Sequence, residues 1–248
     1  GDMDLVLRRN PTIVVKEMTL KNEDWGSRPN MVRIERIEAE IGILSLLSKT
    51  PTVKRLLVTG PELSIETNEM GESNLHFFGA PEASRKPRAG IARVLEVLPR
   101  LSLEEIVVEK GSVSYKDARS GKTHALALKR FTASASGAGG LIEVLLTGDL
   151  DHVPFEVRGT TGPVRILEDP HGAWPLNLTA TALGVTATFK ALSRAPFEPA
   201  GMNLDFIAQV SALKSLPEPF GQPLPLDGPL EISGRGAWSG AETYRFSD

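Results

Sequence analysis

An internal repeat with a period of 50 residues organises this chain. Residues 53–71 read VKRLLVTGPELSIETNEMG, and residues 103–121 read LEEIVVEKGSVSYKDARSG. The aligned pairs are Leu56/Ile106, Val58/Val108, Leu63/Val113, Ile65/Tyr115 and Gly71/Gly121. Repeated units are typical of extended architectures in which each unit stacks on its neighbours. The sequence therefore predicts that both repeats belong to one continuous sheet.

Each repeat has the pattern of a β-meander unit. Apolar and polar residues alternate on both sides of Gly60-Pro61, which places one face in an apolar setting and the other in water. We expect two short strands with a break at Gly60-Pro61. The turn residues from Asn68 to Gly71 then end the second strand.

Further alternating segments follow along the chain. Strands are expected at 12–20, 31–43, 125–131, 142–146, 155–157, 176–181, 185–190, 204–208 and 230–234. The apolar positions change parity near Glu35-Arg36, which predicts a β-bulge, and Phe131 does not fit the alternation of Leu126 and Leu128. The predicted class is mainly β: an extended, strongly twisted antiparallel sheet, curled into an open hydrophobic groove, with a few short helices.

The helical segments are few. Ile91, Val94, Leu95 and Leu98 have helical spacing, which predicts a helical connector at about 88–98 that ends before Pro99. Single helical turns are expected at 44–48 and 162–167. We expect one elongated module over residues 4–248, and we interpret residues 1–3 as a remnant of cloning.

Composition excludes several classes of protein. The 248 residues carry a net charge of −3, which favours neither nucleic acid nor an acidic ligand, and no cysteine, which excludes a disulfide scaffold. No run of 18 apolar residues occurs, so no segment of this sequence is expected to span a membrane. Because the succession of alternating strand segments is cut off at Ser247-Asp248, we expect the chain to be a fragment of a longer protein.

Searches for chemistry find no catalytic constellation. Ser120-Gly121-Lys122-Thr123 resembles the end of a phosphate-binding loop, but Lys116 occupies the place of the leading glycine and a strand follows, so a hairpin turn is expected. The four histidines, His76, His124, His152 and His171, have no second ligand nearby in the sequence. The carboxylates lie along polar, solvated faces. We therefore expect no enzyme, no metal and no cofactor.

Residues 10–77 resemble the N-terminal region of the AsmA family. The resemblance rests on VVKEMTLKNEDWG, RIERIEAEIGILSLLS and VKRLLVTGPELSIETNEMGESNLHF, in which the order of strands and turns follows the family pattern. Residues 106–117 and later strands, down to PLPLDGPLEISGRGAWSG, also follow the longer members. One departure is Leu75-His76-Phe77, where the family often has an aromatic residue directly after the asparagine.

The resemblance implies a bacterial protein anchored in the inner membrane by an N-terminal helix that is absent from this sequence. The rest of the protein would lie in the periplasm as a long sheet curled into a groove. In this it is similar to bridge-like lipid-transfer proteins with a chorein-like N-terminus. The implied activity is to conduct glycerophospholipid between the inner and outer membranes without catalysis, with other envelope proteins as possible partners.

The groove residues predicted from alternation are Ile65, Val113, Tyr115, Leu126, Leu128, Val144 and Leu146. Two alternatives stay open. The apolar faces can close on each other in a β-sandwich that binds protein or glycan, or the chain can serve envelope assembly without contacting lipid. Lipid in an organic extract of the purified protein would distinguish them.

Overall fold

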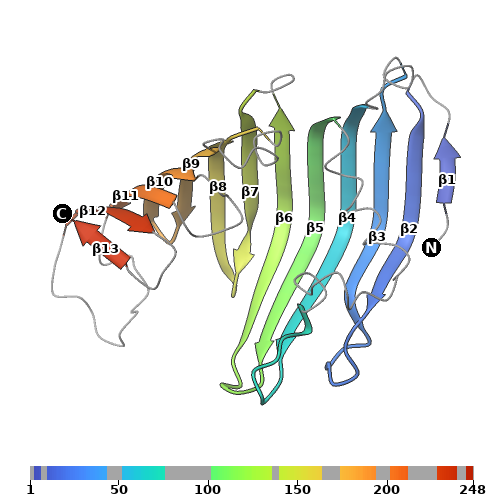
Figure 1. Ribbon diagram of the computed structural model, residues 1–248, viewed down its shortest axis with the longest axis horizontal. Coiled ribbons are helices and arrows are strands. Elements are labelled where there is room, and N and C mark those ends of the chain that lie inside the picture. The colour runs from blue at the N-terminus through green and yellow to red at the C-terminus, as the bar shows by residue number, and fades with distance from the viewer. Residues whose placement is uncertain are drawn as a thin grey trace. The chain divides into compact units, whose positions relative to one another are not determined.

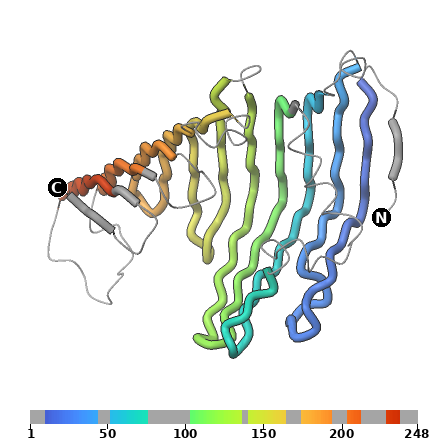
Figure 2. The backbone as a smooth tube through the Cα atoms, in the orientation of Figure 1, coloured from blue at the N-terminus to red at the C-terminus, as the bar shows by residue number. Residues whose placement is uncertain are grey.

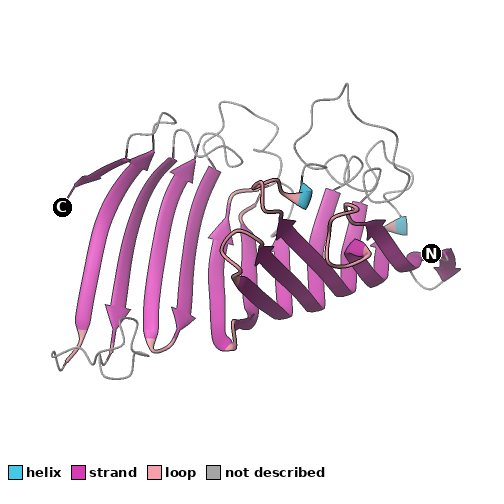
Figure 3. Ribbon diagram, turned by 90° about the horizontal axis from the view of Figure 1, so that it is seen from below, coloured by secondary structure: helices cyan, strands magenta, loops and turns pink. Residues whose placement is uncertain are grey.

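The structure of the chain is a computed structural model. It describes residues 3–6, 10–43, 52–75, 102–135, 140–163, 174–193, 202–211, 228–238 and 244–247. Within these ranges the strands are joined by turns and loops, and helical geometry is confined to isolated turns at Ile43 and Asn74-Leu75 (Figure 3). The expected helices at 44–48 and 88–98 lie outside the described residues, as does 164–167, while Gly162 and Pro163 form a loop.

In the described part of the chain, thirteen strands are hydrogen-bonded in the order in which they occur along the sequence (Figure 1). They are β1 (Met3–Val6), β2 (Thr12–Lys21), β3 (Asn30–Ile41), β4 (Thr52–Thr67), β5 (Ser102–Asp117), β6 (Thr123–Ala135), β7 (Ile142–Leu150), β8 (Val153–Thr161), β9 (Trp174–Ala182), β10 (Val185–Ser193), β11 (Met202–Val210), β12 (Leu230–Trp238) and β13 (Tyr244–Ser247).

The chain divides into two compact units. Unit 1 comprises Gly1–Thr132 and Gly148–His152, and unit 2 comprises Ala133–Thr147 and Val153–Asp248. Each unit is described by itself below. That residues 4–248 form one elongated module stays a prediction.

In unit 1 the two sequence repeats are neighbouring strands. The partners across β4 and β5 are the positions that the repeat aligns: Leu56↔Ile106, Val58↔Val108, Leu63↔Val113 and Ile65↔Tyr115. Both repeats therefore lie in one sheet, as the sequence predicted.

Two details of that prediction were wrong. Each repeat is a single 16-residue strand rather than two short strands, and β4 and β5 run parallel within a sheet expected to be antiparallel. A parallel pair needs a connection that returns the chain to the same end of the sheet, and the residues between Thr67 and Ser102 make that connection. Strands β1 to β4 pair in the antiparallel sense.

A row of irregular residues crosses β2 to β5. It comprises Glu17, Glu35, Gly60 and Lys110, and we call it the bend row. The paired register skips these residues in each strand. Glu17, Gly60 and Lys110 have left-handed φ angles of 54°, 61° and 57°. Irregular positions of this kind bend a strand and re-aim its side chains, and in Figure 2 the strands of unit 1 change direction together part-way along their length.

The alternation of side chains shifts by one position at the bend row. Apolar residues on its two sides are three apart in each strand: Val15 and Met18, Ile34 and Ile37, Val58 and Pro61, Val108 and Gly111. The register between strands is nevertheless unchanged, because Ile34↔Pro61 and Arg36↔Thr59 lie on either side of the row. The predicted irregularity near Glu35 is confirmed, but it is not an insertion into one strand, because every neighbouring strand makes the same shift.

The same shift explains Phe131 in β6. Leu128 and Phe131 are also three apart, and both residues between them are exposed and form ion pairs. Lys129 Nζ lies 2.9 Å from Asp149 Oδ2, and Arg130 Nη1 lies 2.5 Å from Glu109 Oε1. Two consecutive side chains that face solvent leave Leu128 and Phe131 on the opposite face.

Unit 2 has regular alternation. Phe189 on β10 faces Leu178 on β9 and Phe206 on β11, and Phe206 in turn faces Gly234 on β12. These strands are antiparallel to their neighbours, as are β8 and β9. The predicted alternation of Leu176, Leu178 and Ala180 is confirmed by these registers.

Gly60→Ala is expected to lower the free energy of unfolding by about 2 kcal/mol, because alanine disfavours left-handed φ. In addition, the new methyl group would lie 2.5 Å from Cδ of Glu35. Gly121→Ala is the control for backbone strain alone, since φ there is 68° and nothing lies within 4 Å; it should cost about 1 kcal/mol. Urea denaturation measures both. A Gly60→Ala protein as stable as wild type would contradict the role given to the bend row.

Candidate functional site

One face of unit 1 is apolar along every strand. Side chains directly opposite each other on neighbouring strands point to the same face, so the paired register assigns the members. We call this set the apolar face of unit 1. Its members on the paired strands are Ile13, Val15, Met18, Leu20, Val32, Ile34, Ile37, Ala39, Leu56, Val58, Pro61, Leu63, Ile65, Ile106, Val108, Gly111, Val113 and Tyr115.

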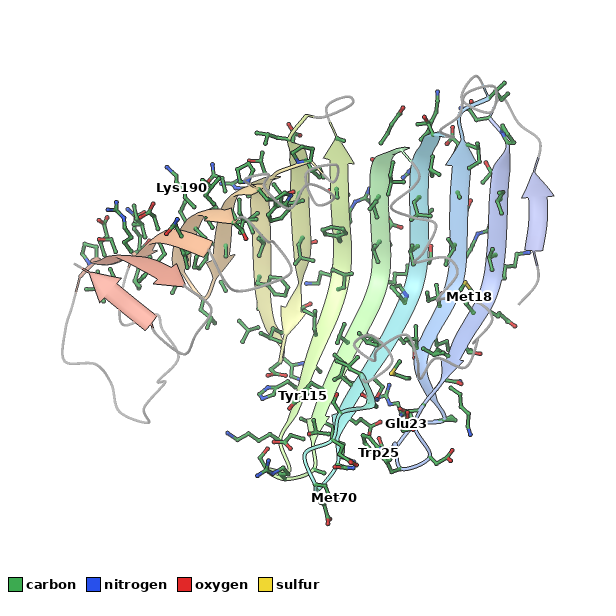
Figure 4. The ribbon with its side chains drawn as sticks, viewed as in Figure 1. Met18, Glu23, Trp25, Met70, Tyr115 and Lys190 are labelled. Atoms are coloured by element: carbon green, nitrogen blue, oxygen red, sulfur yellow. The ribbon has the colours of Figure 1, made fainter. Side chains whose placement is uncertain are left out.

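On the described strands, no side chain of this apolar face is fully buried. Ile13 is 38% exposed and Tyr115, labelled in Figure 4, is 37% exposed, and the others are half-buried apart from the buried glycine. The fully buried apolar side chains of unit 1 lie on the opposite face. Val14 is 2% exposed and Val107 is 0% exposed, and both alternate with members of the apolar face and so point the other way. The larger apolar surface of unit 1 is therefore the less sealed one.

The opposite face carries paired charges. Arg33 lies 3.3 Å from Glu62, Arg36 lies 2.6 Å from Glu38, and Arg55 lies 3.2 Å from Glu105. Pairs as exposed as these contribute little to stability, and their charged groups remain in water. The same face also carries the buried side chains of Val14 and Val107, so it combines solvated ion pairs with buried apolar residues.

The structure brings most of the predicted groove residues together. Ile65 and Tyr115 are direct partners, and Val113 is paired with Leu63 in the next row. Leu128 lies beside Gly111, since a Cβ at Gly111 would be 3.0 Å from Leu128 Cδ2, and Leu126 is two residues away on the same strand. Val144 and Leu146 are half-buried on β7 in unit 2, so they belong to a different unit.

Unit 2 has an apolar face of its own. It includes Phe155, Val157, Leu176, Leu178, Phe189, Leu204, Phe206 and Ile232. The Phe206 ring lies over Gly234: a Cβ added to Gly234 would be 2.7 Å from Cε1 of Phe206. Val210 and Ala191 are nearly sealed, whereas Ile232 is 51% exposed. The reverse side is mixed: the Thr179 and Thr188 hydroxyls lie 3.4 Å apart on it, and Ile207, the partner of Thr188 on β11, is 45% exposed.

A buried polar network ties the loop between β2 and β3 to the end of β4. Asn74 Nδ2 donates to Asn22 Oδ1 at 2.9 Å and to the Ser64 carbonyl at 2.8 Å, and Asn74 Oδ1 accepts from the Glu66 backbone at 2.9 Å. Asn22 Nδ2 donates to Glu66 Oε1 at 3.1 Å. Asn74 is 0% exposed and Glu66 is 5% exposed. Each of these buried polar groups has a partner, which is what such burial requires.

The carboxylate of Glu66 is held ionised within this network. Burial alone would raise its pKa, but hydrogen bonds from Ser27, Asn22 and Ser64 together lower the pKa below the usual value. The Ser27 backbone N–H donates to both carboxylate oxygens, at 3.1 and 2.9 Å. The expectation that all carboxylates lie on solvated faces was therefore wrong for Glu66.

Residues 1–173 match the sequence model of the AsmA family. This chain belongs to the AsmA family. A search of curated protein sequences found no match. No helix in the described part of the chain is long and apolar enough to cross a membrane.

The AsmA resemblance rests partly on residues of the polar network. Asn22 and Asn74 belong to it, and Gly26 is required because a Cβ there would lie 2.2 Å from Asn22 Nδ2. Asn68 Oδ1 accepts the backbone N–H groups of Met70 and Glu72, and Gly71 has a φ of 85°. The sequence identified these residues as a pattern but gave them no role. The spacing of the asparagines was the signal that could have indicated one.

One histidine of this AsmA-family chain is not isolated. His124 Nδ1 lies 2.6 Å from Asp151 Oδ2, although 27 residues separate them in the sequence. His152 follows in the turn, and His76 and His171 lie outside the described residues. Among the described residues, no three His, Asp or Glu side chains are grouped as a metal site would need.

Asn74→Ala is expected to lower the free energy of unfolding by about 2–4 kcal/mol, because it leaves several buried partners unsatisfied. Asn68→Ala is the matched control, since its amide also makes three hydrogen bonds but in solvent. It should cost about 1 kcal/mol or less. Chemical denaturation measures the free energy of unfolding of both variants. An equal loss in the two would contradict the claim that burial makes the hydrogen bonds of Asn74 more important for stability.

Proposed function

We propose that this chain binds glycerophospholipid acyl chains on its apolar faces. We further propose that it forms the periplasmic part of an inner-membrane-anchored AsmA-like protein that conducts lipid between inner and outer membrane. AsmA-family proteins are typically associated with the bacterial envelope. The observation that carries the proposal is the apolar face of unit 1, where the described strands carry a continuous apolar surface with no sealed side chain.

The energetics favour a conduit of this kind. Burying an acyl chain of about 16 carbons is worth roughly 12 kcal/mol, at about 0.8 kcal/mol per methylene. Lipid therefore does not cross water readily, whereas a move from bilayer to protein exchanges one apolar setting for another. The protein needs only to supply a continuous apolar surface, and no catalytic group.

The dimensions of unit 1 suit an acyl chain. Strands lie about 4.8 Å apart, so β2 to β6 span roughly 19 Å, close to the extended length of such a chain. Along β4, the apolar face from Leu56 to Ile65 extends roughly 30 Å. An open sheet curled about the bend row would line a groove with the apolar residues of both sides.

The closed sandwich remains the main alternative. In a sandwich the inward face is sealed, and a charge placed there is left unpaired at a cost of several kcal/mol. Two valines of β5 distinguish the cases. Val113 is half-buried on the apolar face, and Val107 is fully buried on the other face.

Val113→Asp is expected to leave a folded protein with near-wild-type melting and less bound lipid, because an open face lets the carboxylate reach water. Leu128→Glu should behave in the same way. Val107→Asp should destabilise the fold by about 3 kcal/mol or more, because its carboxylate is buried. Circular dichroism measures melting, and mass spectrometry of organic extracts measures lipid per mole of protein.

Ser112→Asp is the control for lipid content. Ser112 is exposed next to Val113 and points to the opposite face, so the same charge there should not alter bound lipid. If Val113→Asp and Leu128→Glu both fail to fold, the face is a sealed core. If all folded proteins carry no lipid, a role in envelope assembly without lipid contact is favoured instead.

A further inference from the structure

The apolar face of unit 1 ends in polar side chains at the hairpin between β5 and β6. The Asp117 N–H donates to the Lys122 carbonyl at 2.9 Å, which sets the pairing of the hairpin and places Tyr115 opposite His124. The ion pair of Glu109 with Arg130 fits the same register. Residues opposite each other share a face, so this row continues the apolar face.

We call Tyr115, Lys122 and His124 the polar lip. His124 lies two residues before Leu126 on β6, and Lys122 lies four residues before it, directly ahead of the strand, so both are on the face of Leu126. Lys122 and His124 are exposed, and Tyr115 is 37% exposed. Figure 4 labels Tyr115 near the lower ends of β5 and β6.

His124 is held in place from the turn between β7 and β8. Asp151 Oδ2 lies 2.6 Å from His124 Nδ1, and Asp151 Oδ1 accepts the Ala125 backbone N–H at 2.7 Å. Asp151 and His152 have φ angles of 48° and 69°, as a tight hairpin turn needs. Because Nδ1 is engaged, Nε2 is the ring nitrogen of His124 that can meet a ligand.

The carboxylates at this end of the sheet are already satisfied by the protein. Asp117 accepts hydrogen bonds from Ser120 Oγ at 2.7 Å, from the Arg119 backbone at 3.0 Å and from Thr67 Oγ1 at 3.0 Å. The pKa of Asp151 is lowered mainly by the hydrogen bond from His124 and, to a smaller extent, by the hydrogen bond from the Ala125 backbone. In the described part of the chain, the Lys122 ammonium forms no ion pair. The lip thus presents donors, while the neighbouring acceptors are occupied.

We propose that the polar lip binds the phosphate of a glycerophospholipid head group whose acyl chains lie on the apolar face of unit 1. This inference rests on the proposed function. The Lys122 ammonium and the Tyr115 hydroxyl donate to phosphate oxygens, and charge-assisted hydrogen bonds of this kind are strong. The row of Val113 and Leu126 begins roughly 7 Å along the strands, where the acyl chains start.

This site differs from a nucleotide phosphate loop. Ser120-Gly121-Lys122-Thr123 is a hairpin turn followed by β6, and Gly121 has a φ of 68°. No helix N-terminus follows the glycine to bind phosphate through its backbone N–H groups. The phosphate is bound by side chains at the edge of an apolar surface, which suits a ligand with a hydrocarbon part.

The test compares two lipids with the same acyl chains, phosphatidylglycerol and diacylglycerol, for binding to the delipidated chain. The wild type is expected to bind phosphatidylglycerol about tenfold more tightly, and Lys122→Gln should lose most of that preference while binding diacylglycerol unchanged. Tyr115→Phe should lose a smaller part. Lys190→Gln, on the polar face of β10, is the matched control and should behave as wild type.

The outcomes separate the two proposals. If neither lipid binds the wild type, the proposed function fails. If both bind equally well, the proposed function survives and the lip does not bind phosphate. Equal loss of preference in Lys190→Gln would make net charge the cause and overturn the lip. Binding of inorganic phosphate that depends on Lys122, without any preference between the lipids, would assign the site to free phosphate and overturn the head-group assignment.

Discussion

The paired register of β2 to β5 is the constraint on which the rest of unit 1 depends. Every strand shifts its side-chain alternation at the bend row, and Gly60 permits that shift in β4 with a left-handed φ of 61°. A shift in one strand alone would turn its apolar residues toward water on one side of the row. Because all strands shift together, apolar residues stay opposite each other, as Ile34 is opposite Pro61 and Ile37 opposite Val58. One continuous apolar face results.

The sequence predicted the parts of this fold that depend on local alternation. The phase of Leu63 with Val113 and the alternation within 176–181 were correct, and the anomalies at Glu35 and Phe131 were genuine. The sequence could not show that β4 and β5 run parallel, because apolar and polar residues alternate in the same way in parallel and antiparallel strands. The network of Asn22, Glu66 and Asn74 was missed, since its members come from three loops and strand ends that meet only in the folded chain.

The two polar features of unit 1 have different physical roles. The network of Asn22, Glu66 and Asn74 is buried and has its donors and acceptors paired, so it fixes the loop between β2 and β3 against β4. The polar lip of Tyr115, Lys122 and His124 is exposed, and it presents the Lys122 ammonium and the Tyr115 hydroxyl beside the apolar face. A satisfied network gives rigidity, whereas unsatisfied donors at a surface favour a ligand.

Photocrosslinking along β4 tests the central claim most directly. A photoreactive residue is placed in turn at each position from Leu56 to Ile65 except Gly60, and the protein is irradiated with phospholipid vesicles. The account predicts lipid adducts at 56, 58, 61, 63 and 65, with the alternation shifting at Gly60, and few at 57, 59, 62 and 64. Adducts on both faces alike, or an alternation that runs unbroken through Gly60, would contradict it.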